Sequence, residues 1–121
     1  MTSESSSPER RELELAISDQ SELPALREWL RGQPGVEVEV AAGTPGPGEQ
    51  GALDVLTVLA GSSGLVTAIR ILPAFIRSRR EGLRIEGTFQ GEKFVLEATN
   101  VKDMLPVLER MERMVERPPG D

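Results

Sequence analysis

The chain has 121 residues, with 14 Lys and Arg against 20 Asp and Glu, and it contains no Cys, no His and no Tyr. This composition excludes Ser-His and Cys-His nucleophile pairs, disulfides, and the two ligands that zinc prefers. The net charge of −6 opposes non-specific binding to nucleic acid or to anionic lipid. An enzyme would be left with carboxylate, Lys, Arg or Ser/Thr chemistry, so the composition favours a binding or assembly module.

The length and the hydrophobic fraction of 38% are typical of one soluble domain, which we expect over residues 11–116. Residues 1–10 are charged and Ser-rich without an apolar stretch, so we expect a disordered leader and not a signal peptide. Residues 117–121 contain two Pro and a Gly and should form a disordered tail. A cytoplasmic location is the expectation that follows.

The first third of the domain predicts a strand, a helix and a second strand. Apolar and charged residues alternate over Arg11–Ile17, which indicates a half-buried strand. Leucines at helical spacing predict a helix from about Ser21 to Arg31. Valines alternate with glutamates over Val36–Val40, which indicates another strand. The Gly- and Pro-rich residues 42–51 then predict a mobile loop.

The next segment is apolar around most of its circumference. Gly51–Arg80 reads GALDVLTVLAGSSGLVTAIRILPAFIRSRR and carries only Asp54 and Arg70 as charges before its terminal arginines. We expect one long hydrophobic helix here, broken or kinked near Gly61–Gly64 and again at Pro73.

The last third predicts a hairpin and a closing helix. Alternation over Leu83–Phe89 and again over Phe94–Leu96, with Gln90-Gly91 between them, indicates two strands joined by a tight turn. Apolar residues at steps of three and four from Val101 onward predict a helix, and Pro106 favours a start near Asp103. The order β-α-β-α(long, kinked)-β-β-α predicts an α+β two-layer sandwich, in which one roughly four-stranded sheet carries helices on one face.

The apolar segment has three interpretations. A membrane span is disfavoured, because the uncharged stretch Val55–Ile69 is shorter than the ~20 residues that a helical span needs. Burial in the core and self-association both remain open, since small residues in this segment would let two backbones approach closely. The candidate self-association residues are Leu59, Gly61, Gly64, Leu65, Ile69 and Ile76.

The densest cationic cluster of this acidic chain has two interpretations. It consists of Arg70, Arg77, Arg79, Arg80 and Arg84, and its members could lie near a helix C-terminus as solvated charges. Alternatively, it forms a docking patch for an acidic partner surface, including the Glu-rich surface of another copy. The candidate docking residues are Arg77, Arg79, Arg80 and Arg84.

The Gly-Ser-Ser-Gly element at Gly61–Gly64 is neither a nucleophile elbow, which needs a His partner, nor a phosphate loop, since Leu65 follows where Lys would stand. Its N–H groups could accept an anion with Arg70 or Arg77, which makes a small-ligand or nucleotide sensor the alternative function.

Glutamates on the two predicted N-terminal strands would share one sheet face if those strands pair in compatible register. We interpret this set as a solvated face and not as a cation site, because no Gly-rich loop turns between the strands. We therefore predict no metal and no cofactor. The residues concerned are Glu12, Glu14, Glu37 and Glu39.

Taken together, four pieces of the sequence resemble a bacterial family, the first-described type of the effector-associated constant component. They are LREWLRG at Leu26–Gly32, the apolar segment, the hairpin LRIEGTFQGEKFVLEATNV, and the closing helix. The resemblance covers roughly Glu12 to Met114 and is best at Gly61–Leu65, Ile76–Arg80 and Leu83–Val101. Pro73 and the pair Phe75-Ile76 depart from the family pattern.

The resemblance implies a small non-enzymatic adaptor of NTP-dependent conflict systems, encoded beside variable effectors such as trypsin-like or caspase-like peptidases. It implies a peptidase-type effector or an NTPase of the same system as partner. We also expect a homo-oligomer, and no nucleic acid or membrane partner.

Overall fold

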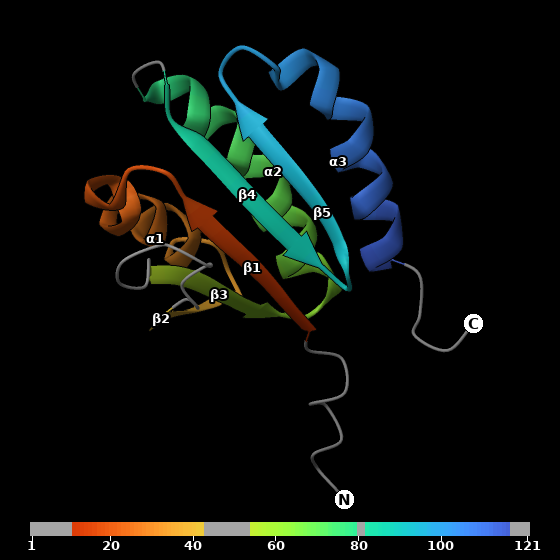
Figure 1. Ribbon diagram of the computed structural model, residues 1–121. Coiled ribbons are helices and arrows are strands. Elements are labelled where there is room, and N and C mark those ends of the chain that lie inside the picture. Colours follow the sequence, from red (N-terminus) through yellow and green to blue (C-terminus); the bar gives the residue numbers. More distant parts are fainter. Residues whose placement is uncertain (1–10, 43–53, 80–81, 117–121) are drawn as a thin grey trace, which may run out of the picture.

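The computed structural model describes residues 11–42, 54–79 and 82–116. Within them the chain forms one antiparallel sheet in the order β2-β3-β1-β4-β5, with three α-helices against one of its faces (Figure 1). The strands are β1 (Arg11–Ile17), β2 (Glu37–Ala42), β3 (Asp54–Ala60), β4 (Arg84–Phe89) and β5 (Glu92–Glu97). The helices are α1 (Leu23–Arg31), α2 (Ser62–Ser78) and α3 (Val101–Glu116), and a 3₁₀ turn at Gln20–Glu22 precedes α1.

The three helices cover the sheet from one side to the other. α1 contacts β2 and β3, α2 contacts β3, β1 and β5, and α3 packs on β5 and on α2. Burial alternates along every strand except β2, as in β1, where Leu13, Leu15 and Ile17 are buried while Glu12 and Glu14 are exposed. The predicted α+β class and the half-buried first strand are therefore confirmed, and no further element among the described residues covers the opposite sheet face.

The predicted long helix over the apolar segment is wrong in its first part. Residues 54–60 form β3, which pairs with β1 on one side and with β2 on the other. Leu56, Val58 and Ala60 are buried, and the intervening residues face the other way. A short apolar run does not distinguish a buried strand from a buried helix by periodicity, and its β-branched residues favour the strand. The sheet therefore has five strands and not four.

α2 begins directly after β3 and is not interrupted at Pro73. Gly61 is its N-cap and the next three residues form its first turn, so the Gly-Ser-Ser-Gly element begins the helix and is not a break within one. Pro73 lies inside α2 and is buried. The helix lies in the centre of the helical layer, and its inward side chains are fully buried there, which stabilises it enough to keep a proline within it.

The hairpin and the closing helix are confirmed. Gln90 and Gly91 join β4 to β5 with φ of 52° and 85°, the left-handed pair that a two-residue hairpin turn uses. α3 begins at Val101 and not near Asp103. Asn100 precedes it and accepts the Glu97 N–H through its side chain at 2.7 Å, while the buried Val101 anchors the first turn to the core.

The predicted leader 1–10, nearly all of the predicted loop 42–51 and the predicted tail 117–121 lie outside the described residues. Among the helices of the described part, none is long and apolar enough to cross a membrane.

Candidate functional site

The uncovered face of the sheet is the most extensive candidate surface. β3 lies between β2 and β1, so Leu59 has Glu12 on one side and Glu37 on the other. Two residues along, Thr57 lies between Glu14 and Glu39 in the same way. The predicted sharing of one face by these glutamates is confirmed, although the two glutamate strands do not pair directly. We call Glu12, Glu14, Glu37 and Glu39 the glutamate frame.

The glutamate frame surrounds a centre of lower polarity, formed by Leu59 and Thr57. All of its side chains are exposed, whereas Leu59 and Thr57 are half-buried. The side-chain carboxylates of Glu12, Glu14 and Glu39 make no ion pair or hydrogen bond within the described chain. From the usual spacing between strands and the rise per residue, the Cα atoms of these glutamates lie about 10 Å apart across β3 and about 7 Å apart along each strand.

The remainder of this face carries charges of both signs. Glu86 faces outward on β4, and Lys93 faces outward on β5 opposite Thr88. Arg84 and Glu97 are cross-strand partners, with Arg84 Nε 3.9 Å from Glu97 Oε2. The negative potential is therefore concentrated over β2, β3 and β1.

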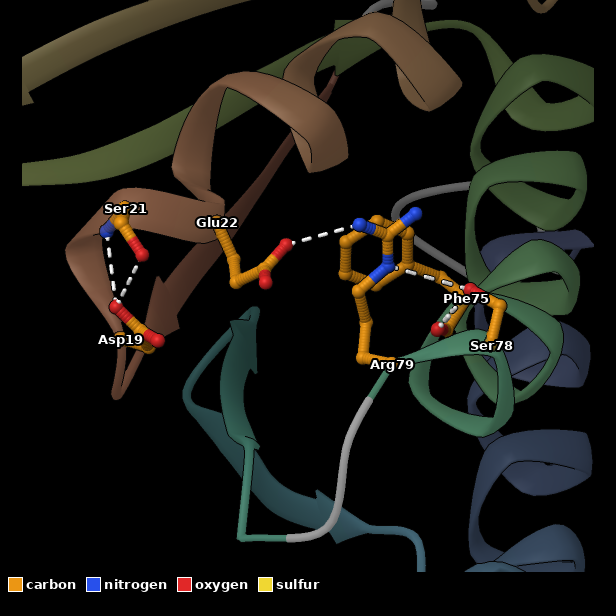
Figure 2. A network of polar contacts seen from close by, with 6 residues as sticks. All are labelled: Asp19, Ser21, Glu22, Phe75, Ser78 and Arg79. Atoms are coloured by element: carbon orange, nitrogen blue, oxygen red, sulfur yellow. Dashed lines mark hydrogen bonds and ion pairs between the residues drawn. The ribbon is translucent and has the colours of Figure 1, made fainter.

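Arg79, one of the predicted docking residues, is held by contacts within the chain (Figure 2). Its Nη1 donates to Glu22 Oε1 at 2.9 Å, and its guanidinium lies 4.9 Å from the centre of the Phe75 ring. Its Nε donates to Ser78 Oγ at 3.3 Å. Arg79 thus fastens the end of α2 to the turn that precedes α1, and its charge is compensated there. A docking role for it stays a prediction.

The other predicted docking residues do not form one patch with Arg79. Arg77 is exposed on the last turn of α2, while Arg84 lies on the uncovered sheet face. Arg80 lies outside the described residues. The sequence places these arginines close together along the chain, but the change from helix to strand directs them to different sides of the molecule.

The predicted self-association residues on α2 lie in the core. Leu65, Ile69 and Ile76 have no exposed surface, and Gly64 is buried. A Cβ at Gly64 would lie 2.8 Å from the Cβ of Ala60, so the glycine allows α2 to approach β3. These side chains are part of the core in this fold. Their role in self-association stays a prediction.

The other two predicted self-association residues lie at the surface. Leu59 is half-buried on the uncovered face, between two members of the glutamate frame. Gly61 is half-buried at the start of α2. Only Leu59 therefore offers an apolar side chain to a partner.

The predicted anion site at the start of α2 is assembled only in part. A surface pocket there is lined by Ser62, Ser63, Val66, Thr67, Arg70 and Glu116. Arg70 is thus brought to the helix start as predicted, but its Nε donates to Glu112 at 3.1 Å. Arg77 lies at the opposite end of the helix. Two carboxylates near the pocket oppose the binding of an anion.

Sequence reasoning missed the part played by Arg11. Its Nη2 donates to Ser62 Oγ at 3.0 Å and to the carbonyl oxygen of Val115, and its guanidinium lies 5.7 Å from the centre of the Phe89 ring. Arg11 therefore joins the start of β1 to the start of α2 and the end of α3, where a cation also interacts favourably with the helix dipole. Its partners are up to 104 positions away in the chain, so no local signal could have found it.

No metal site is assembled by the acidic residues that the structure describes. No group of three or more carboxylates there could hold a metal ion.

Comparison with known proteins gives one finding and one negative result. No curated protein matches the chain. A family model, Effector Associated Constant Component 1, matches residues 16–116, from the end of β1 to the end of α3. This match includes most of the uncovered face, all three helices and the hairpin, and it confirms the resemblance found in the sequence. The chain therefore belongs to the Effector Associated Constant Component 1 family.

Proposed function

We propose that this protein is a non-enzymatic adaptor of a bacterial conflict, or defence, system that acts in the cytoplasm and couples to an effector. The family name supports an effector-associated component. The effectors we propose are peptidases of the trypsin-like or caspase-like kind, with an NTPase of the same system as a further partner. The chain would supply contact surfaces to these partners and no reaction centre of its own.

The observation that carries the proposal is the uncovered face of the sheet. The helices bury one face, and the other presents Leu59 and Thr57 among charged residues. A hydrogen-bonded sheet is rigid, so a partner that docks on it loses little of its affinity to ordering of the surface. The exposed carboxylates of this face lie in water and not in an apolar pocket, which favours contact over catalysis.

Co-purification of the full chain with the effector encoded beside it tests the adaptor function. Leu59→Arg places a bulky cation in the middle of the uncovered face, and we expect it to reduce recovery of the complex at least tenfold. Leu105→Arg is the matched control, because Leu105 is 38% exposed on α3 in the opposite layer. Circular dichroism verifies that both variants fold. Equal recovery of the effector by both variants and by the unaltered chain would refute docking through this face.

Self-association is the second half of the proposal, and we place it at the outer edge of β2. In the described chain this edge pairs with no further strand, and Val40 there is 46% exposed. An antiparallel pairing of two β2 strands with Val40 opposite Val40 would place Glu39 opposite Ala41, which avoids facing carboxylates. Light scattering over a concentration series tests this idea. A monomer that stays monomeric with its effector present would contradict it.

Sensing of a small anion or nucleotide is the alternative function. The approach of Arg70 to Ser62 and Ser63 in one pocket supports it, while Glu116 in that pocket and the pairing of Arg70 with Glu112 oppose it. A thermal-shift screen separates the two functions, since a ligand that binds the folded state raises the melting temperature. Absence of any shift at millimolar nucleotide would exclude the sensor.

A further inference from the structure

We propose that the sheet has one open edge, along β2, and one closed edge, along β5, so that self-association stops at two copies. Asn100 is the residue that closes the β5 edge. The inference rests on the self-association half of the proposed function. It names the partner at β2 as one further copy of the chain and not a growing row of copies.

The register of the hairpin shows which backbone groups form the outer edge of β5. Residues that flank a two-residue turn exchange backbone hydrogen bonds, and bonded and non-bonded pairs then alternate along the ladder. Phe89 and Glu92 flank the turn, so Val95 and Glu97 lie in non-bonded pairs with their β4 partners. The N–H and C=O groups of Val95 and Glu97 therefore point away from β4, toward the outer edge.

Asn100 occupies three of these outer groups. Its Nδ2 donates to the Val95 carbonyl oxygen at 3.1 Å, and its Oδ1 accepts the Glu97 N–H at 2.7 Å. Its backbone N–H donates to the Glu97 carbonyl oxygen at 3.1 Å. Asn100 stands directly before α3, which packs against β5 (Figure 1). Another strand would need the same groups for its own ladder, so it cannot pair here without displacing Asn100.

The first half of the β5 edge is protected by charge. Lys93 is exposed there, and Glu92 is paired with Arg110 of α3 at 3.4 Å. Natural edge strands carry charged side chains, Lys above all, which oppose pairing with a further strand. The β5 edge is therefore covered by Asn100 in one half and charged in the other.

The outer edge of β2 differs in both respects. Within the part of the chain that the structure describes, residues 38–42 form hydrogen bonds with β3 only. Val40, Ala41 and Ala42 are uncharged and exposed. Val40 lies opposite the buried Leu56 and so faces the helical side of the sheet, yet it is 46% exposed. The β2 edge thus leaves part of the core layer uncovered, which favours pairing.

Pairing of two β2 strands about a two-fold axis uses the same edge of both copies, so no β2 edge remains for a third. With Val40 of one copy opposite Val40 of the other, each side chain covers its counterpart. Both ends of the joined sheet are then β5 edges that Asn100 closes. The Glu39 carboxylates of the two copies become diagonal neighbours at about 7–8 Å, so raised salt should strengthen this pairing.

Sedimentation velocity of the full chain over a concentration series is the first test. The unaltered chain should form one associated species, of twice the monomer mass. Val40→Lys should weaken the association about tenfold or more, because a lysine on an edge strand opposes pairing. Val95→Lys is the matched control, since Val95 is 37% exposed on β5, and this change should leave the association unaltered.

Substitution of Asn100 is the second test. Asn100→Ala should produce species of three and more copies, whose average mass rises with concentration. Adding Lys93→Thr removes the charge from the other half of the edge and should increase their share. Adding Val40→Lys instead should limit association to two copies at most. Thr99→Ala is the matched control, because Thr99 is exposed and its hydroxyl contacts the Glu97 side chain at 3.4 Å, and it should give two copies only.

A milder variant and a measurement on the unaltered chain keep the test decisive if Asn100→Ala does not fold. Asn100→Ser retains a short polar side chain that can bond one of the two edge groups but not both, so it should fold and form the larger species at higher concentration. Amide hydrogen exchange should show the Glu97 N–H protected at every concentration. The outer amides of residues 38–42 should gain protection only as two copies associate.

Several results would overturn the inference. They are larger species formed by the unaltered chain, folded Asn100 variants that stop at two copies, a Thr99→Ala control that behaves like Asn100→Ala, free exchange of the Glu97 amide, and displacement of the second copy by an effector bound at β2. If the unaltered chain and the folded Asn100 variants all form two copies through β2, self-association stands and the role of Asn100 is wrong. If the unaltered chain stays monomeric with its effector while Asn100→Ala associates, Asn100 closes the β5 edge and self-association through β2 is refuted.

Discussion

Gly87 provides the sharpest test of the packing described above. It lies on the buried face of β4, directly opposite Phe94 on β5. A Cβ added at Gly87 would lie 2.2 Å from Cζ and 2.3 Å from Cε2 of the Phe94 ring, more than 1 Å inside ordinary contact. The ring covers the glycine and is itself only 3% exposed. Gly87→Ala therefore forces a buried aromatic ring to move within a closely packed core.

The expected loss follows from two opposing effects. Overpacking a core typically costs about 1–3 kcal/mol. Replacing Gly by Ala restricts the unfolded chain and gains roughly 0.4–1 kcal/mol. The net prediction is that Gly87→Ala lowers the free energy of unfolding by about 1–2 kcal/mol, which corresponds to a melting temperature lower by roughly 4–16 °C in a domain of this size.

The assay is urea unfolding followed by circular dichroism, in a double-mutant cycle with Phe94→Leu. Leu has no ring over position 87, so Gly87→Ala in that background should be neutral or stabilising by up to about 1 kcal/mol. The coupling between the two positions should therefore be about 1 kcal/mol or more. Equal losses in both backgrounds, or no loss in the unaltered background, would refute the contact between ring and glycine.

Three further predictions concern α2, Arg79 and the glutamate frame. Ile69→Asp places a charge at a fully buried position, so it should unfold the domain and abolish the circular dichroism spectrum of the folded chain. A variant that stays folded and only loses self-association would contradict the core position of Ile69. Arg79→Gln removes the ion pair to Glu22 and the contact with Phe75, so urea unfolding should show a loss of about 1 kcal/mol, and an unchanged midpoint would contradict a fastening role. Glu39→Gln should raise the melting temperature slightly at low salt and leave it unchanged at high salt, and a lower melting temperature at both would show that Glu39 makes a stabilising contact.

The sequence alone predicted the family resemblance and the class of fold, and it predicted part of the candidate site. Alternation in the first strand showed that Glu12 and Glu14 share a face opposite the core, because the side-chain period of a strand is two. The same holds for Glu37 and Glu39. The two pairs flank Leu59 and Thr57 because β3 lies between β2 and β1. The local sequence pattern could not predict this arrangement, since it does not specify the order of strands in a sheet.

Two kinds of property of this protein can now be separated by their physical origin. The sequence by itself determined the absence of His and Cys chemistry, the hairpin, the amphipathic closing helix and the outward direction of the glutamates, since each depends on composition or on neighbours within a few residues. Only the tertiary structure decided that residues 54–60 are a central strand, that Leu65, Ile69 and Ile76 are core, and that Arg79 is neutralised by Glu22. Each of these depends on contacts between segments far apart in the chain, whose free energy outweighs local preference.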